Sequence, residues 1–167
     1  MSMTYRQATV SAFVRMLTNL SGILDKGAEY AHSKKFDESI LLNSRLYPDM
    51  YPLLKQVQVA TDMAKFCVAR LTGEEAPRFA DDETSFAQLK ERIANTIAFI
   101  AGVSDAAFAG AADREIILPW MPDKPMKGEF YVLHFAQPNV YFHLTMAYAI
   151  LRHNGVPLGK MDFIGPL

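Results

Sequence analysis

The sequence has little of what several protein classes depend on. Its single cysteine, Cys67, has no partner for an intramolecular disulfide, which favours a reducing compartment. Basic residues are not in excess, because 17 Lys and Arg oppose 18 Asp and Glu, and this balance argues against a nucleic-acid surface. No run of about 18 apolar residues predicts a membrane span. The start, MSMTYRQATV, lacks the features of a signal peptide, so we expect a cytoplasmic protein.

What is present is enough for one packed core. The chain has 167 residues, of which half are hydrophobic and 11% are aromatic. A chain of this size and composition predicts one domain over residues 1–167 that needs no disulfide or metal to fold.

Four segments show the three-and-four spacing of apolar residues that is typical of amphipathic helices. The first is expected over residues 4–26, where Thr4 and Gln7 have the spacing of a capping box. The second is expected from Pro48 to Gly73, after a connector with a short helical piece at 39–43.

The second half of the chain contains the other two helices. An acidic loop over 74–83 precedes the third, which starts at a second capping box, Ser85 and Gln88, and ends at Gly102. A short helical turn is expected at 105–109. The fourth helix is expected from Pro138 to Asn154, with the tail lying over the surface.

Residues 115–136 break the helical pattern. Two apolar runs, 116–118 and 130–135, flank three prolines, and we interpret them as short strands or extended arms, such as a hairpin. The predicted fold is therefore all-α, a four-helix up-and-down bundle with a short extended or hairpin segment before the last helix.

His143 is the most informative polar residue of the fourth helix. At about 100° per residue it shares a face with Asn139, Met146 and Ile150, which are mostly apolar and mark the inward side. A buried imidazole needs hydrogen-bond partners, and Asn139 lies one turn away. Three interpretations remain open: a satisfied core histidine, a ligand-binding group and a metal ligand.

Other polar residues are candidates for the same pocket. Gln56 and Gln58 flank the apolar stripe of the second helix on opposite sides, so they cannot both point at its centre. His134 precedes the fourth helix and could lean over the mouth of a cavity near His143, or merely pack at its rim. Cys67 lies on the edge of an apolar stripe, which predicts an inert thiol.

Tyr141 and Tyr148 lie two turns apart on the outer side of the fourth helix. Large aromatic side chains on an outward stripe favour a protein contact, of which a homodimer is the simplest kind. The alternative is that the extended arms or the tail cover this side within one chain.

Two strings carry a family resemblance: LLNSRLYPDMYPLLKQVQVATDMAK (41–65) and QPNVYFHLTMAYAILRHNGVPLGK (137–160). They resemble an uncharacterised bacterial family, a domain of unknown function, of the DinB-like superfamily of metalloenzymes. The resemblance implies a four-helix bundle with an unusual right-over-left helix order, often dimeric. Many superfamily members hold a divalent metal with three histidines, and some relatives are thiol transferases.

The resemblance also implies positions for those three histidines. The ending 151–156 (LRHNGV) sets the register, so His143 matches the second histidine of a His-x-x-x-His pair and Asn139 stands at the first. The histidine of the second helix falls within 56–59, where Gln56 and Gln58 are the nearest polar residues.

Three functions follow as hypotheses. The first is a DinB-like bundle that binds a small ligand or a partner at a pocket of five residues: His143, Asn139, Gln58, Gln56 and His134. The second is a thiol transferase-like enzyme that uses zinc, nickel or manganese held by His143 and weaker ligands. The third is a purely structural homodimer. No catalytic residue is assigned, and neither nucleic acid nor membrane is expected as a partner.

Overall fold

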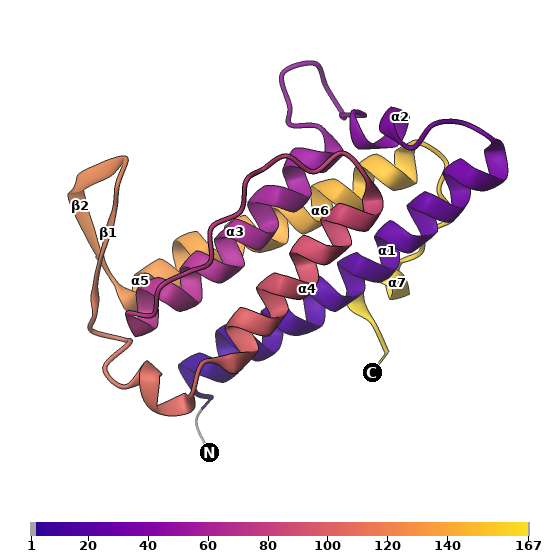
Figure 1. Ribbon diagram of the computed structural model, residues 1–167. Coiled ribbons are helices and arrows are strands. Elements are labelled where there is room, and N and C mark those ends of the chain that lie inside the picture. Colours follow the sequence, from indigo (N-terminus) through magenta and orange to yellow (C-terminus); the bar gives the residue numbers. More distant parts are fainter. Residues whose placement is uncertain (1–2, 167) are drawn as a thin grey trace.

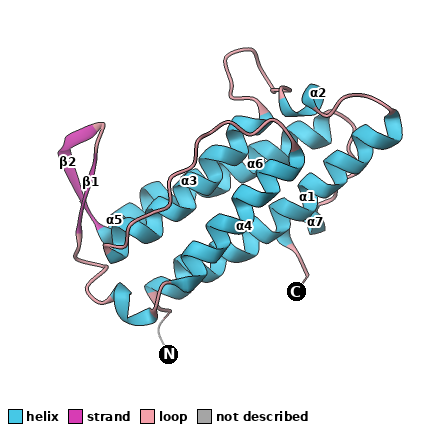
Figure 2. Ribbon diagram, viewed as in Figure 1, coloured by secondary structure: helices cyan, strands magenta, loops and turns pink. Residues whose placement is uncertain are grey.

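The computed structural model describes residues 3–166 and is mainly helical, with one small sheet (Figures 1 and 2). The expectation of a helical chain with a short extended segment is therefore confirmed. The elements, in chain order, are η1 (Gln7–Ser11), α1 (Ala12–Lys34), α2 (Ser39–Leu42), α3 (Leu53–Thr72), α4 (Phe86–Gly102), η2 (Asp105–Phe108), β1 (Glu115–Leu118), β2 (Met121–Lys127), α5 (Gly128–Tyr131), η3 (Val132–Ala136), α6 (Gln137–His153) and α7 (Lys160–Ile164).

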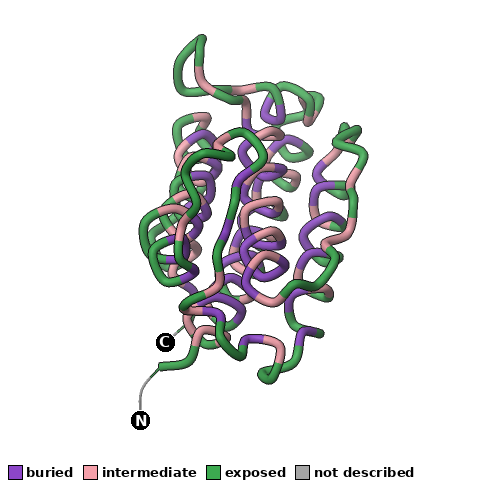
Figure 3. The backbone as a smooth tube through the Cα atoms, turned by 90° about the vertical axis from the view of Figure 1, so that its left-hand side faces the viewer, coloured by how far each residue is buried: buried purple, intermediate pink, exposed green. Residues whose placement is uncertain are grey.

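The four long helices surround a common core. Helix α3 lies between α4 and α6, and α1 contacts both α4 and α6 on the other side. The buried stretches of these helices turn toward one another (Figure 3). The core contains apolar side chains from all four helices, including Phe13, Leu17, Val57, Ile93 and Val140. None of the helices within residues 3–166 is both long and apolar enough to cross a membrane.

The direction of α4 differs from the expected up-and-down order. The N–H of Phe86, at the start of α4, donates to Glu38 next to α2, 3.4 Å away. Arg6, before α1, reaches the carbonyl oxygen of Ala101 at the end of α4, 3.2 Å away. Helix α3 also starts beside α2, because Leu53 N–H donates to Ser44 O. Helices α3 and α4 are therefore parallel, and the up-and-down order is wrong at this connection.

The segment that makes this order feasible is residues 73–85, which we call the crossover segment. It runs back along the length of α3 before α4 begins (Figure 1). At roughly 3.3 Å per residue it can span about 40 Å, which exceeds the rise of either helix beside it. Helix α6 is parallel to α1, because the Gln137 side chain donates to Ala8 O at 2.8 Å.

Local sequence signals explain where the helices start. Thr4 and Gln7 form both bonds of the expected capping box, at 3.0 and 3.1 Å. The second box is half formed. Ser85 Oγ accepts from Gln88 N–H at 3.2 Å, whereas Gln88 Oε1 accepts from the N–H of Thr84.

Helix α1 continues to Lys34, beyond the expected end at residue 26. Gly27 does not end the helix. It lies where an added Cβ would come within 3.1 Å of Phe86 and 3.2 Å of Leu151, so its role is close packing.

The hairpin before α6 is present, but the expected second strand is displaced. Strands β1 and β2 are antiparallel, with Glu115 opposite Lys127 and Leu118 opposite Met121. The run 130–135, expected to be extended, is helical and leads through α5 and η3 into α6. The prolines of β2 are tolerated because a two-stranded ribbon has two edges, on which missing N–H groups cost little.

Candidate functional site

His143 and Gln56 form a buried polar pair between two helices. His143 lies on α6 and is 8% exposed, and Gln56 lies on α3 and is 2% exposed. Their side chains meet with 2.7 Å between His143 Nδ1 and Gln56 Oε1. The other end of the amide is fixed too, because Gln56 Nε2 donates to the carbonyl oxygen of Tyr51 at 3.1 Å.

This geometry sets the protonation of the imidazole. An amide oxygen only accepts hydrogen bonds, so Nδ1 carries the proton. Burial lowers the pKa of His143 below its usual value of 6.5, so the ring is neutral near pH 7. Nε2 has no hydrogen-bond partner among residues 3–166, and it is not fully enclosed by protein atoms, so its lone pair is available to a ligand that reaches it.

Asn139 lies one turn before His143 and is half-buried. Its Nδ2 donates to Phe135 O, 2.6 Å away in the preceding turn, which leaves the amide oxygen for other partners. Phe142 contacts the imidazole edge-on, with 5.2 Å between the ring centroids. The pair therefore has one amide neighbour and one aromatic wall.

His134 does not share this position. The helical run from α5 into α6 places it nine residues before His143, roughly 13 Å along the axis and near the opposite side of the helix. It is exposed, and its ring lies 4.6 Å from that of Phe130. An extended arm would have let His134 lean toward His143, and the helix removes that option.

Gln58 is as buried as Gln56 but faces the other way. Its Nε2 donates to Glu83 Oε2 of the crossover segment at 2.8 Å, and its backbone carbonyl accepts from Arg92 at 3.4 Å. Of the five candidate residues, the structure brings His143, Gln56 and Asn139 to one seam, between α3 and α6. Gln58 belongs to the opposite side of α3.

Gln58 is part of a polar cluster around Arg92 that the sequence reasoning missed. Arg92, on α4, is 3% exposed. Its Nη1 binds Asp81 at 2.6 Å and Glu83 at 2.9 Å, and its Nη2 binds Asp62 at 2.8 Å. The sequence did contain a signal for this cluster. Arg92 is a charged residue beside Ile93, on the inward side of the helix, and an acidic loop precedes that helix.

The ion pairs of Arg92 lower the pKa of Glu83. Burial alone would raise that pKa, but the hydrogen bonds from Arg92 and Gln58 and the charge of Arg92 outweigh burial. The same balance, with Lys55 in addition, lowers the pKa of Asp81. Both carboxylates are therefore ionised near pH 7 and hold the crossover segment to α3 and α4.

Cys67 is fully buried, and burial raises the pKa of its thiol. A thiol held in its neutral form is a poor nucleophile. The geometry therefore agrees with the inert role that its place on an apolar stripe predicted.

The donors near His143 fit a divalent metal poorly. Within residues 3–166 no group of three or more His, Cys, Asp or Glu side chains lies close enough together to hold an ion. Gln56 Oε1 already accepts the Nδ1 proton of His143, and Gln58 points away. One imidazole and one free amide oxygen, that of Asn139, form a weak set compared with the three or more strong ligands that zinc prefers.

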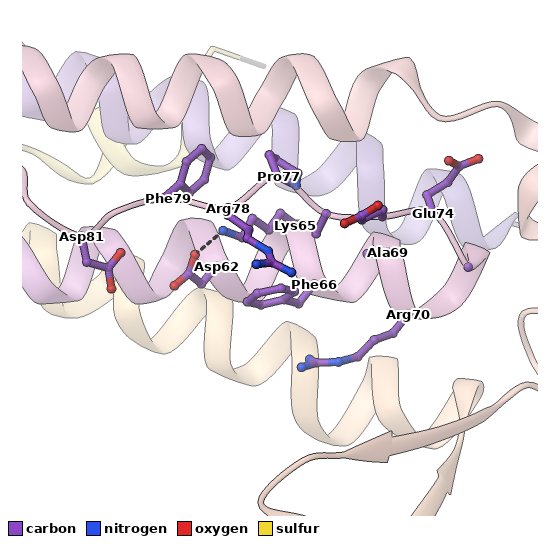
Figure 4. Close-up of a pocket in the computed structure, with 13 residues that line it drawn as sticks. Asp62, Lys65, Phe66, Ala69, Arg70, Glu74, Pro77, Arg78, Phe79 and Asp81 are labelled. Atoms are coloured by element: carbon purple, nitrogen blue, oxygen red, sulfur yellow. Dashed lines mark ion pairs between the residues drawn. The ribbon is translucent and has the colours of Figure 1, made fainter.

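A cavity of about 620 Å³ lies elsewhere, between α3 and the crossover segment (Figure 4). His143 does not line it. Its walls combine aromatic and charged side chains, among them Lys65, Phe66, Arg70, Arg78 and Phe79.

Comparisons with known proteins agree with this architecture. None of the curated proteins compared with the chain matches it significantly. A crystal structure described as a DinB family member protein from Shewanella denitrificans is 47% identical, covers 97% of this chain and 92% of its own, and superimposes with a TM-score of 0.93. The family described as Domain of unknown function (DUF1993) matches residues 5–164. The chain therefore belongs to the DUF1993 family and is similar to a DinB family member, as the two strings of the sequence indicated.

Proposed function

We propose that this protein is a DinB-type four-helix bundle that binds the polar group of a small molecule or partner at His143. The observation that carries the proposal is the 2.7 Å contact between His143 Nδ1 and Gln56 Oε1. It fixes one tautomer and leaves the Nε2 lone pair without a partner within the described residues.

The chemistry of such a site is hydrogen-bond acceptance. A neutral imidazole offers Nε2 to a ligand N–H or O–H, and the free oxygen of Asn139 offers a second acceptor one turn away. Phe142, which is 51% exposed, supplies an apolar wall. A ligand with a donor group on an apolar body matches this set better than an anion does.

The same imidazole geometry supports one alternative. Metal-bound histidines usually donate one ring N–H to an oxygen and bind the metal through the other nitrogen. A zinc, nickel or manganese ion on His143 Nε2, with Asn139 as a weak second ligand, would then act as in a thiol transferase-like enzyme. The mismatch of the donor set makes this the second choice.

The decisive experiment compares ligands and metals on matched variants. A library of alcohols, amines and amides is screened by thermal shift on wild type, His143→Phe and His134→Phe, in protein purified without a metal-binding tag. Ligand binding at His143 predicts stabilising compounds that act on wild type and His134→Phe but lose their effect in His143→Phe.

Two outcomes contradict the proposal. Compounds that stabilise His143→Phe as well as wild type bind elsewhere. A stoichiometric divalent ion in purified wild type that disappears in both His143→Phe and the milder His143→Gln would favour the metal alternative instead. Helical circular dichroism checks that each variant is folded.

A further inference from the structure

A second candidate site is independent of His143, which does not line it. It lies between α3 and the crossover segment that runs back along this helix, and we call it the crossover groove. Its volume of about 620 Å³ is within the range of small-molecule sites in proteins.

The ion pairs beside the groove balance one another. Three cations, Lys55, Lys65 and Arg92, face three carboxylates, Asp62, Asp81 and Glu83. This cluster contributes no net charge, so any excess charge in the groove comes from its other residues.

Arg70 and Arg78 are the two cations among these other residues, and Glu74 and Glu75 equal them in number, so the two arginines act as local donors and not through a net positive charge. Both line the groove, and neither has a carboxylate within ion-pair distance in the part of the chain that is described. Arg70 is pre-positioned: its Nη1 donates to the Tyr131 hydroxyl at 2.9 Å, and its guanidinium lies 5.1 Å from the ring centroid of Phe66 and 5.8 Å from that of Trp120. No other hydrogen bond engages Arg70 within residues 3–166, so its remaining N–H groups can donate to a ligand.

Arg78 comes from the crossover segment and is exposed. Its guanidinium extends into the groove toward Phe66, while Glu74 turns away at the far end (Figure 4). An arginine in this position can donate hydrogen bonds from its planar guanidinium to a ligand that lies in the groove against Phe66.

Aromatic rings give the groove its apolar surface. Phe66 and Phe79 are half-buried and line it, and the buried Lys65 Nζ lies 4.8 Å and 3.9 Å from their ring centroids. The ion pair with Asp62 fixes Lys65, and Lys65 in turn holds both rings in place. Because the rings are only half-buried, part of their surface stays open to a ligand.

We propose that the crossover groove binds a small organic anion, with its carboxylate or phosphate group on Arg78 and Arg70 and its apolar body against Phe66. Glu74 and Glu75 also line the groove and repel a second negative group, so the structure favours a ligand with one anionic group over a polyanion. This proposal does not depend on the proposed role of His143.

Trp120 is the only tryptophan and contacts Arg70, so its indole N–H resonance reports on the groove. In ¹H–¹⁵N spectra, benzoate and phenyl phosphate are titrated against acetate and inorganic phosphate. We expect saturable shifts of the Trp120 indole with the aromatic anions, and binding of the bare anions weaker by about ten-fold.

Variants connect the shifts to the groove. Arg78→Ala, at an exposed position, is expected to weaken benzoate binding by about five-fold or more, and Arg78→Lys by less. Lys124→Ala removes an exposed cation from β2 and is expected to change nothing. His143→Phe is likewise expected to leave benzoate binding intact, which separates this test from that of the proposed function.

The proposal is wrong if benzoate and phenyl phosphate cause no saturable shift at 10 mM, on the order of the weakest affinity useful for recognition. It is also wrong if Arg78→Ala and Arg70→Gln bind as well as wild type. Equal affinity for acetate and benzoate would show that the phenyl ring of benzoate gains nothing from Phe66. It would therefore contradict the proposal that the ligand is an anion with an apolar body.

Discussion

At the scale of single residues, the buried polar side chains carry most of the chemistry. His143 is held neutral by burial, with one nitrogen committed to Gln56. Arg92 is held charged by three carboxylates, with its Nε donating to Thr61 at 2.7 Å. Each arrangement predicts a distinct response to substitution or pH.

For His143 we expect a loss of stability on mild acidification. Because burial lowers its pKa in the folded protein, the unfolded chain binds the proton more readily. The contribution of His143 is therefore fully present above the unfolded pKa of about 6.5 and is lost as pH falls through the lower folded pKa. Urea unfolding of wild type and His143→Gln between pH 7.5 and 5 tests this, and equal pH slopes would contradict it.

For Arg92 we expect Arg92→Met to lower the free energy of unfolding by about 3–5 kcal/mol, because it removes the hydrogen bonds of a buried guanidinium and leaves the partly buried Glu83 without its cation. Arg152→Met, at an exposed position of α6, is the matched control and should stay within about 0.5 kcal/mol of wild type. Urea denaturation at pH 7 measures both, and similar values for the two variants would refute the role of Arg92.

At the scale of elements, the backbone is packed tightly at the junction between the hairpin and α5. A Cβ at Gly128 would lie 1.8 Å from the carbonyl oxygen of Ala111, and Gly128 N–H donates to Arg114 O. Gly128→Ala must displace this backbone, and we expect a loss of about 1–3 kcal/mol. Gly22→Ala, where nothing lies within 4 Å, should instead stabilise α1 by up to about 1 kcal/mol. Thermal unfolding distinguishes the two.

The elements also show what sequence patterns can and cannot predict. The helices, the two short helical pieces and the inward side of His143 follow from apolar spacing and caps, which are local properties. The run 130–135 was assigned wrongly because a short apolar run is compatible with either a strand or a buried helix. The parallel order of α3 and α4 depends on where the crossover segment ends, and local patterns carry no such information.

The same limit applies to the candidate pocket. Periodicity indicated that Gln56 and Gln58 lie on opposite sides of α3, but not which of them meets α6. The Arg92 cluster joins residues from α3, the crossover segment and α4, and its partner Asp62 is 30 residues away in the sequence. Such pairings follow from packing alone.

At the scale of the whole molecule, the outer side of α6 is partly covered by the chain itself. Tyr148 packs edge-on against Phe163 of α7, with 5.9 Å between ring centroids, as the alternative of a covering tail predicted. Tyr141 and Phe142 remain exposed, at 37% and 51%. A homodimer, if it forms through α6, is therefore predicted to use these two residues.

This prediction is tested by sedimentation velocity. We expect Tyr141→Asp to shift a wild-type dimer toward monomer, because a buried unpaired carboxylate opposes association. Tyr51→Asp, which places the same charge at an exposed position before α3, should leave the dimer intact. A wild type that is monomeric at all concentrations would contradict the homodimer.

The crossover segment also has a consequence for folding kinetics. Parallel α3 and α4 cannot close as a local hairpin, so their contacts form only after the chain has travelled back along α3. The ion pairs of Arg92 join both helices to that returning segment, which makes them late events on the folding pathway. Weakening these ion pairs should therefore accelerate unfolding and leave the refolding rate nearly unchanged. The crossover segment then determines the lifetime of the native state and not the rate of folding.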